Sequence, residues 1–257
     1  MPAFQNGYNN KFANGEWDNE ITGFWVAKYE TINNSGKPKN ISTTSTQCWR
    51  SITPAEAFAT CRKMEADYKA TYFGDTVNAA SGIYSYGIYE NDSNNIDTHL
   101  IKNSEWGAVA YLTWSEYGAG STMLNKENYY INQHVTAAYS STGLNITGIY
   151  GLSGGAHDMV AAGPNILNTS ASPCYNSSNT STKYATVYNN DISASTIYGD
   201  AMQETMTWGY NHGTLYTQLI CRGGYITTST NGVLAYQNKN YDAADSVTFR
   251  PVIIVEY

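Results

Sequence analysis

Two short motifs near the end of the chain, Cys221-Arg222-Gly223-Gly224-Tyr225 and Thr248-Phe249-Arg250-Pro251-Val252, decide how this sequence is expected to fold. The segment between them is rich in Tyr, Asn, Ser, Thr and Gly. Tyrosine supplies rigid amphipathic contact area and small polar residues supply adaptable hydrogen bonds, so this composition is typical of binding surfaces. The sequence therefore predicts a binding segment framed by two structural motifs, with the rest of the chain supporting it.

The overall composition excludes several classes of protein. The chain has 257 residues and a formal net charge of −7, and only 14% of its residues are charged. A negative net charge argues against nucleic acid as a partner, because phosphate binding needs clustered lysine and arginine. No run of about 18 apolar residues occurs, so no membrane insertion is expected. A polar surface with few charges suits a virion-surface, extracellular or cell-surface protein.

The length allows one β-rich domain, and no internal repeat or clean boundary divides the chain. We expect a single domain over 1–257, with 1–20 as an N-terminal arm and 208–252 as a ligand-display region. The four cysteines form no Cys-x-x-Cys pair, so no zinc or redox motif is indicated. Buried free thiols are the favoured interpretation and one disulfide is the alternative for Cys48, Cys61, Cys174 and Cys221.

Local signals predict two helices. Thr53, Pro54 and Glu56 match an N-cap, a first helical position and a capping box, and Ile52 precedes the cap. A second helix is expected to start at Asn103-Ser104-Glu105. The apolar face of the first helix comprises Ala57, Phe58, Cys61, Met64 and Tyr68. Strands are expected at 21–30, where both faces would be buried, and at 218–221, 232–236 and 249–255, with long polar loops over 71–95, 119–146 and 163–200.

Five motifs then occur in order along the chain. They are Ile21–Glu30, Asn103–Leu112, Gly148–Asp158, Arg222-Gly223-Gly224 and Phe249-Arg250-Pro251-Val252. Together they resemble the formylglycine-generating-enzyme, or sulfatase-modifying-factor, family, whose fold is a variant of the C-type lectin fold. The resemblance implies an α+β fold of C-type-lectin-like architecture, with a mixed twisted sheet, two helices and long loops.

The residues that the family's enzymes need are missing here. Those enzymes resemble this chain at the Gly-Gly motif but carry an active-site cysteine pair shortly after it, which binds copper. Residues 225–241 contain no cysteine, and a thiolate oxidase cannot act without thiolates. His99, His134, His157 and His212 lack metal-ligand spacing. The sequence therefore predicts no catalytic residues, no metal site and no cofactor, and it is most similar to the family's non-enzymatic branch, found in gut bacteria and their prophages.

Two further motifs were weighed against structural roles. Gly151-Leu152-Ser153-Gly154-Gly155 matches the letters of a hydrolase nucleophile elbow, but the helix that should follow is not indicated. Where the family usually has Gly-Asn-Val-Trp-Glu, with Asn and Glu binding a structural calcium in several members, this chain has Gly154-Gly155-Ala156-His157-Asp158. Asp158 is interpreted as a residue that makes a cap or turn hydrogen bond, with calcium binding as the alternative.

The resemblance also implies which residues bind a ligand. The branch includes variable proteins of diversity-generating retroelements, which act as phage receptor-binding or bacterial surface proteins and have randomised residues near the two framing motifs. A polar loop without a binding role is the alternative, and Arg222, Phe249 and Arg250 are assigned to the scaffold. The predicted ligand-binding residues are Trp208, Tyr210, Asn211, His212, Tyr216, Tyr225, Thr227, Tyr236, Lys239 and Tyr241.

The function predicted from these observations is recognition of a host-cell surface protein or glycan, as a phage tail receptor-binding protein or a surface adhesin. The chain could also form a homo-oligomer. The first alternative is a structural subunit of a virion or pilus, and the second is an oxidase of the formylglycine-generating type.

Overall fold

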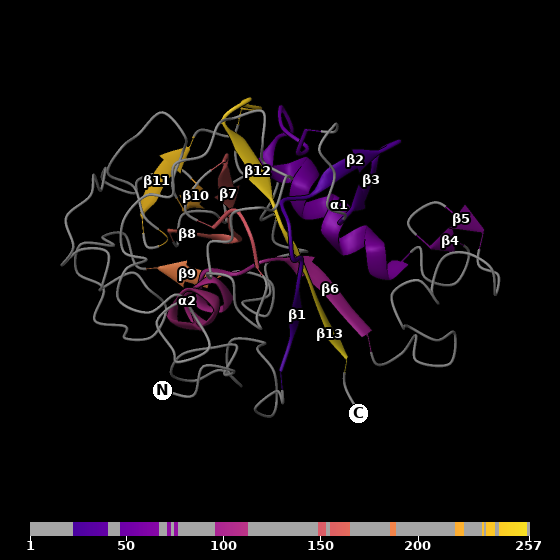
Figure 1. Cartoon of the computed structure of the whole chain (residues 1–257), viewed down its shortest axis with the longest axis horizontal. Helices are drawn as coiled ribbons and strands as arrows, with labels where there is room; N and C mark the ends of the chain where they lie inside the picture. The colour runs from indigo at the N-terminus through magenta and orange to yellow at the C-terminus, as the bar shows by residue number, and fades with distance from the viewer. Residues whose placement is uncertain are drawn as a thin grey trace.

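The computed structural model describes residues 23–40, 47–66, 71–72, 75–76, 96–112, 149–152, 155–164, 186–188, 219–223, 233, 235–239 and 242–255. These residues form two helices and several small sheets (Figure 1), which confirms the α+β class. The helices are α1 (Pro54–Ala66) and α2 (Asn103–Leu112). The strands are β1 (Trp25–Val26), β2 (Ile32–Asn34), β3 (Lys37–Lys39), β4 (Thr71–Tyr72), β5 (Asp75–Thr76), β6 (Ile96–Leu100), β7 (His157–Met159), β8 (Ala162–Pro164), β9 (Thr186–Tyr188), β10 (Leu219–Arg222), β11 (Tyr236–Lys239), β12 (Val247–Phe249) and β13 (Pro251–Val255).

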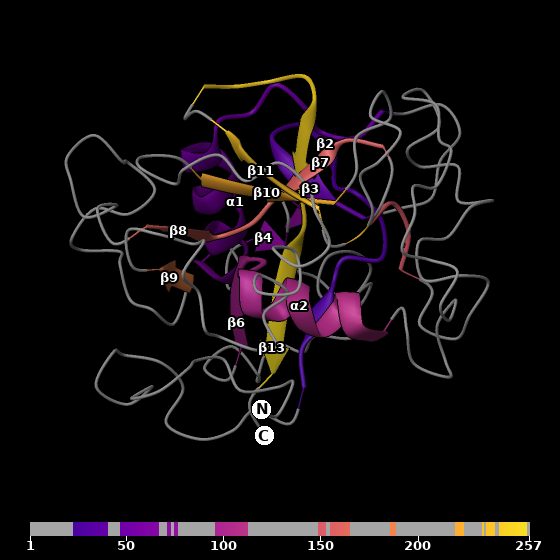
Figure 2. The ribbon, with the colours of Figure 1, turned by 90° about the vertical axis from the view of Figure 1, so that its left-hand side faces the viewer.

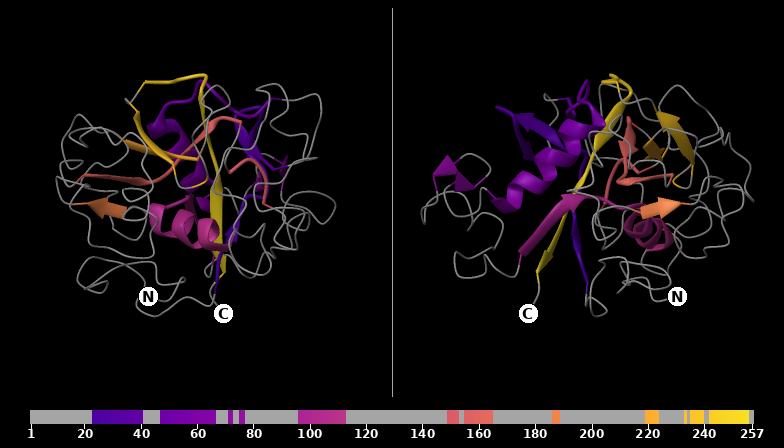
Figure 3. Two further views of the ribbon diagram at one scale, coloured as in Figure 1. Left: turned by 60° about the vertical axis from the view of Figure 1, so that its left-hand side comes forward. Right: turned by 180° about the vertical axis from the view of Figure 1, so that it is seen from behind.

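Two sheets form the centre of the described structure. A four-stranded sheet has the order β11-β10-β7-β12, in which β10 is antiparallel to both neighbours and β12 is parallel to β7. A three-stranded antiparallel sheet has the order β1-β13-β6. Figure 3 shows this second sheet from behind, with β13 between β6 and β1. The sheet arrangement is therefore mixed, as the sequence predicted, and it brings the first and last described strands together.

Arg250 is the single residue between β12 and β13, where the chain passes from one central sheet to the other. The sequence predicted one uninterrupted strand over 249–255. The structure divides it, because Phe249 pairs with Met159 in one sheet whereas Pro251 pairs with Leu100 in the other. The Phe-Arg-Pro motif therefore joins the two sheets, and its arginine lies at the junction.

The core consists of two hydrophobic clusters on opposite faces of the four-stranded sheet. Neighbouring residues alternate between them, since Ile220 belongs to the first cluster and Cys221 to the second. Helix α2 contributes Trp106 and Val109 to the first cluster, and α1 contributes Phe58 to the second. The two helices therefore cover different sides of β7 and β10, an arrangement that can be followed in Figure 2.

Helix α1 begins as its sequence signals predicted. The Thr53 backbone N–H donates to Glu56 Oε2 over 2.9 Å, and the Glu56 N–H donates to Thr53 Oγ1 over 3.2 Å, which is a complete capping box. Ile52 is buried in the same cluster as Ala57 and Phe58. Four of the five predicted face residues, Ala57, Phe58, Cys61 and Met64, are buried, and Tyr68 lies outside the described residues.

Helix α2 starts where the sequence predicted, and its first turn is also capped. The Glu105 side chain reaches back to the Lys102 backbone N–H over 2.8 Å, and the Lys102 carbonyl accepts from the Trp106 N–H over 2.9 Å. Lys102 therefore occupies the N-cap position and Glu105 the third helical position. The described helix ends at Leu112, and the stretch that follows lies outside the described residues.

Two further strand predictions and one loop prediction need correction. Among the described residues of the strand predicted at 21–30, only Trp25 and Val26 form β1, and Trp25 is 73% exposed, so burial of both faces was wrong. The strand predicted at 232–236 lies later, as β11. The loop predicted at 163–200 contains β9, which pairs in parallel with β8. The N-terminal arm at 1–20 lies outside the described residues, as does much of 208–252.

Candidate functional site: the base of the display segment

Two of the ten predicted ligand-binding residues lie in the described structure. Tyr236 and Lys239 are the first and last residues of β11, opposite Arg222 and Leu219 of β10. Gln237, between them, is exposed. The other predicted contact residues, Trp208, Tyr210, Asn211, His212, Tyr216, Tyr225, Thr227 and Tyr241, lie outside the described residues. What the structure does show is how the chain enters and leaves the segment 224–232.

Gly223 fixes the entry to this segment. Its φ of +76° lies in the left-handed region, which side chains with a Cβ rarely adopt, and a Cβ there would overlap the backbone carbonyl of Leu152. The Gly223 N–H donates to the Ala235 carbonyl over 2.9 Å. The Gly223 carbonyl accepts from His157 Nδ1 over 3.0 Å. Both polar backbone groups of Gly223 are therefore bonded to the framework.

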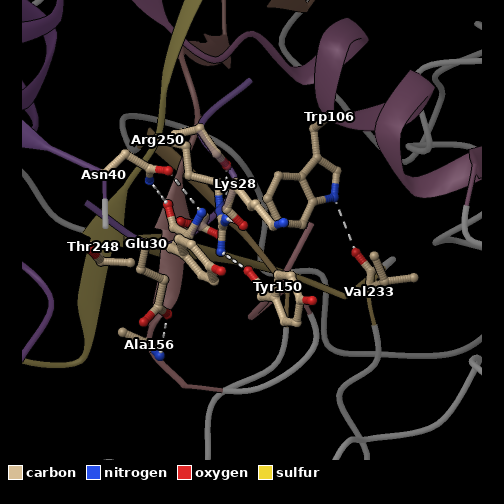
Figure 4. Close-up of polar contacts among 12 residues, drawn as sticks. Lys28, Glu30, Asn40, Trp106, Tyr150, Ala156, Val233, Thr248 and Arg250 are labelled. Carbon is tan, nitrogen blue, oxygen red and sulfur yellow. Dashed lines mark hydrogen bonds and ion pairs between the residues drawn. The ribbon is translucent and has the colours of Figure 1, made fainter. Parts of the chain in front are cut away.

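Trp106 fixes the exit from the same segment. Its indole Nε1–H donates to the Val233 carbonyl over 3.1 Å, as Figure 4 shows. The Trp106 side chain is completely buried, and Val233 packs in the same hydrophobic cluster. The chain is therefore held by buried residues on either side of 224–232, at Gly223 before it and at Val233 after it.

A buried arginine organises the framework beneath this base. Arg250 Nε–H donates to Asp158 Oδ2 over 2.8 Å, and Nη2–H donates to the Tyr150 carbonyl over 2.6 Å. Its Nη1 lies 3.2 Å from the Ala27 carbonyl oxygen and 3.4 Å from that of Lys28. Figure 4 shows the Arg250 guanidinium next to Lys28 and Tyr150. The assignment of Arg250 to the scaffold is confirmed, because its guanidinium is buried and bonds to internal acceptors.

Asp158 therefore has a different role from the one predicted. The sequence interpretation was a cap or turn hydrogen bond, but the residue lies in β7 and forms a buried ion pair with Arg250. Burial raises the pKa of Asp158, and the Arg250 guanidinium opposes that shift. The partner lies 92 positions further along the chain, so no local pattern could have indicated the pair.

Glu30 completes this buried electrostatic group. Its Oε1 accepts from the Ala156 N–H over 2.9 Å, and burial together with the nearby Asp158 raises its pKa to about 8. With a pKa of about 8, Glu30 is mostly protonated at neutral pH, which leaves it uncharged beside the Asp158–Arg250 pair. Protonation avoids a second buried charge that the single guanidinium would not neutralise.

The described histidines and cysteines all take structural positions. His99 Nε2 lies 2.8 Å from Glu105 Oε1, and both side chains are buried. Burial raises the pKa of the Cys61 thiol, and burial also raises that of Cys48, with Glu30 adding to the shift. Cys48, Cys61 and Cys221 are buried free thiols, as predicted, and Cys174 lies outside the described residues. Within the described part of the chain, no three His, Cys, Asp or Glu side chains gather as metal ligands.

Sequence reasoning missed Trp106, His157 and Leu152 as supports of the display segment. The glycine at 223 was the available signal, because its motif implied a close backbone approach. Nothing in the sequence showed that the approaching backbone would be Leu152. Neither helix in the described residues combines the length and apolar character that crossing a membrane requires.

Similarity to known proteins is found among solved structures. No protein-family model matches this chain, and no curated protein matches it. Among solved structures, the chain is similar to Treponema denticola variable protein 1, with 13% sequence identity, coverage of 88% of this chain and 78% of that chain, and a TM-score of 0.40.

Proposed function

We propose that this chain is a non-catalytic binding protein that presents residues between 208 and 241 to a surface protein or glycan of a host cell. The observation that supports this proposal best is the fixed base of segment 224–232. Gly223 and Val233 are held by Leu152, His157 and Trp106, so side chains between them can change without moving the framework. A binding protein that must accept many surface sequences needs such a base.

The composition of the segment supports the same proposal. Tyrosine, asparagine, serine and threonine dominate 225–241, and no cysteine lies between the two framing motifs. A rigid base also limits the entropy lost on binding, which raises affinity without new contacts. We place the protein on a virion or cell surface, where it acts as a receptor-binding protein or adhesin.

A triple substitution tests the proposal. Tyr225→Ala, Tyr236→Ala and Tyr241→Ala together should abolish binding of the fluorescently labelled protein to a panel of bacterial and epithelial cells, measured by flow cytometry. Its melting temperature should stay close to that of the wild type. Trp25→Ala serves as the control, because it removes an aromatic side chain that is 73% exposed outside the segment. Loss of folding in the triple variant would instead place these tyrosines in the core and contradict the proposal.

A further inference from the structure

Three side chains outside residues 208–241 form one cluster. The Tyr29 and Tyr150 rings stack with centroids 5.1 Å apart and planes inclined by 30°. Lys28 Nζ lies 5.3 Å from the Tyr150 centroid and 5.8 Å from that of Tyr29. Lys28 is exposed and both tyrosines are half-buried, so a cation and aromatic surface reach solvent at one place. We call these three residues the Lys28 platform.

Backbone bonds hold the Lys28 platform rigidly. The Tyr150 N–H donates to the Lys28 carbonyl over 2.8 Å, which joins the two chain segments that carry the side chains. Arg250 binds carbonyls of both segments from below. The Asn40 side chain donates to the Tyr29 carbonyl over 2.6 Å and accepts from the Tyr29 N–H over 3.3 Å. Figure 4 shows Lys28, Asn40 and Tyr150 around Arg250. A preorganised group of this kind loses little freedom when a ligand binds.

The segment that carries Lys28 and Tyr29 differs in the sign of its charge from the whole chain. Residues 23–52 contain four basic side chains and one acid, Glu30, in a chain whose net charge is −7. Glu30 is buried, so the basic side chains dominate the exposed charge of this segment. In the described structure, no carboxylate lies within ion-pair distance of the Lys28 ammonium. The basic side chains are Lys28, Lys37, Lys39 and Arg50.

We propose that the Lys28 platform is a second binding site, separate from residues 208–241, which takes a saccharide that carries a carboxylate. The apolar C–H face of a sugar ring packs on tyrosine, and a sugar carboxylate forms a charge-assisted hydrogen bond with the ammonium. The 5.3 Å between Nζ and the Tyr150 centroid is comparable to the size of one sugar unit, so a single acidic sugar reaches both. A neutral sugar would gain only the aromatic contact.

Sialyllactose and lactose test the proposal, because they share a core and differ in the carboxylate-bearing sugar. We expect the protein to bind sialyllactose in the millimolar range, as measured by saturation-transfer NMR. Lactose should bind at least tenfold more weakly, because it lacks one hydrogen bond to a charged group, which is worth roughly 1.5 kcal/mol or more. Lys28→Met should weaken sialyllactose binding by a similar factor. Tyr150→Ala should also weaken it, and Lys28→Met covers the case in which the tyrosine variant folds poorly, since Lys28 is exposed.

Lys37→Met is the matched control. Lys37 lies in β3 of the same basic segment, and among the described residues no aromatic contact to it is present, so its removal changes the same charge without touching the platform. Equal losses for Lys28→Met and Lys37→Met would show general electrostatic attraction and overturn the site. Equal binding of the two sugars, or none, would overturn it as well. The triple tyrosine variant of the display segment should keep sialyllactose binding, so this site and the display segment can fail independently.

Discussion

At the scale of single residues, Arg250 carries more of the framework than any pattern around it suggests. Its guanidinium bonds to one carboxylate and to carbonyls from two distant segments, and its side chain is completely buried. Arginine suits this position because its planar fork of donors can satisfy several acceptors at once, which the single ammonium of lysine cannot do. The sequence motif indicated an internal arginine, but its partners came only from the structure.

Removal of the Arg250 side chain should destabilise the protein strongly. Arg250→Ala leaves Asp158 as a buried unpaired carboxylate, and breaking a buried ion pair in this way typically costs about 3–5 kcal/mol of the free energy of unfolding. Urea denaturation followed by circular dichroism measures the loss. Arg50→Ala is the control, since Arg50 makes exposed bonds to Asp245 and Gln47, and it should cost about 1 kcal/mol or less. Similar costs for both variants would contradict the role given to Arg250.

Glu30 predicts a dependence of stability on pH. Its folded-state pKa of about 8 lies above the ordinary value of 4.5, so the folded chain holds this proton more tightly than the unfolded chain does. The contribution of Glu30 to stability is therefore complete below about pH 4.5 and declines as the pH rises toward 8. Glu30→Gln keeps a neutral side chain at every pH, so it does not lose this stability. The free energy of unfolding of the variant, relative to that of the wild type, should therefore rise across this range by on the order of a few kcal/mol.

Urea denaturation of the wild type and of Glu30→Gln at pH 5 and pH 8 measures this difference. Glu56→Gln is the comparison. The Thr53 hydrogen bonds lower the pKa of Glu56, so the stability that Glu56 contributes changes with pH in the opposite direction to that of Glu30. Glu56 contributes stability above its unfolded pKa that is lost on acidification. A stability difference between the Glu30 variant and the wild type that does not change with pH would show that Glu30 keeps an ordinary pKa.

At the scale of elements, local signals predicted the helices well and the strands poorly. Helix α1 was predicted to its first residue, because Thr53, Pro54 and Glu56 stabilise the helix start through bonds among themselves. The predicted bounds of β1 and β11 were wrong, because a strand is defined by partners elsewhere in the chain. β1, for example, pairs with residues 252 and 253. The sequence near Trp25 could not show that β1 would keep its Trp25 face exposed after pairing with β13.

The β10–β11 connection gives a test at this scale. Gly223→Ala forces a Cβ into the left-handed region and against the Leu152 carbonyl, so it should cost at least about 2 kcal/mol and disturb segment 224–232. Gly36→Ala is matched, because Gly36 has a φ of +82° and nothing within 4 Å of the added Cβ. Gly36→Ala should cost only about 1 kcal/mol of the free energy of unfolding, because it adds the strain of the left-handed backbone without a steric clash. Thermal denaturation measures both, and equal losses would exclude close packing at Gly223.

At the scale of the whole molecule, the two clusters depend on each other through shared strands. Ile220 and Cys221 are neighbours within β10 but belong to different clusters. A strand that packs on both faces cannot loosen on one side without moving on the other. The sequence predicted a single domain because it showed no boundary. It could not show how the helices were distributed, because pairing between distant strands decides which face each helix covers.

This sharing predicts that the described core unfolds as one cooperative unit. Phe58→Leu, in the second cluster, should lower the free energy of opening by about 1 kcal/mol not only for the amides of α1 but equally for those of α2, in the first cluster. Native-state hydrogen exchange in low urea measures each helix separately. Val109→Ala in α2 makes the reciprocal test, and the amides of α1 should lose protection by the same amount as those of α2. If either variant left the other helix with wild-type protection, the chain would consist of two folding units, and a single domain over 1–257 would be wrong.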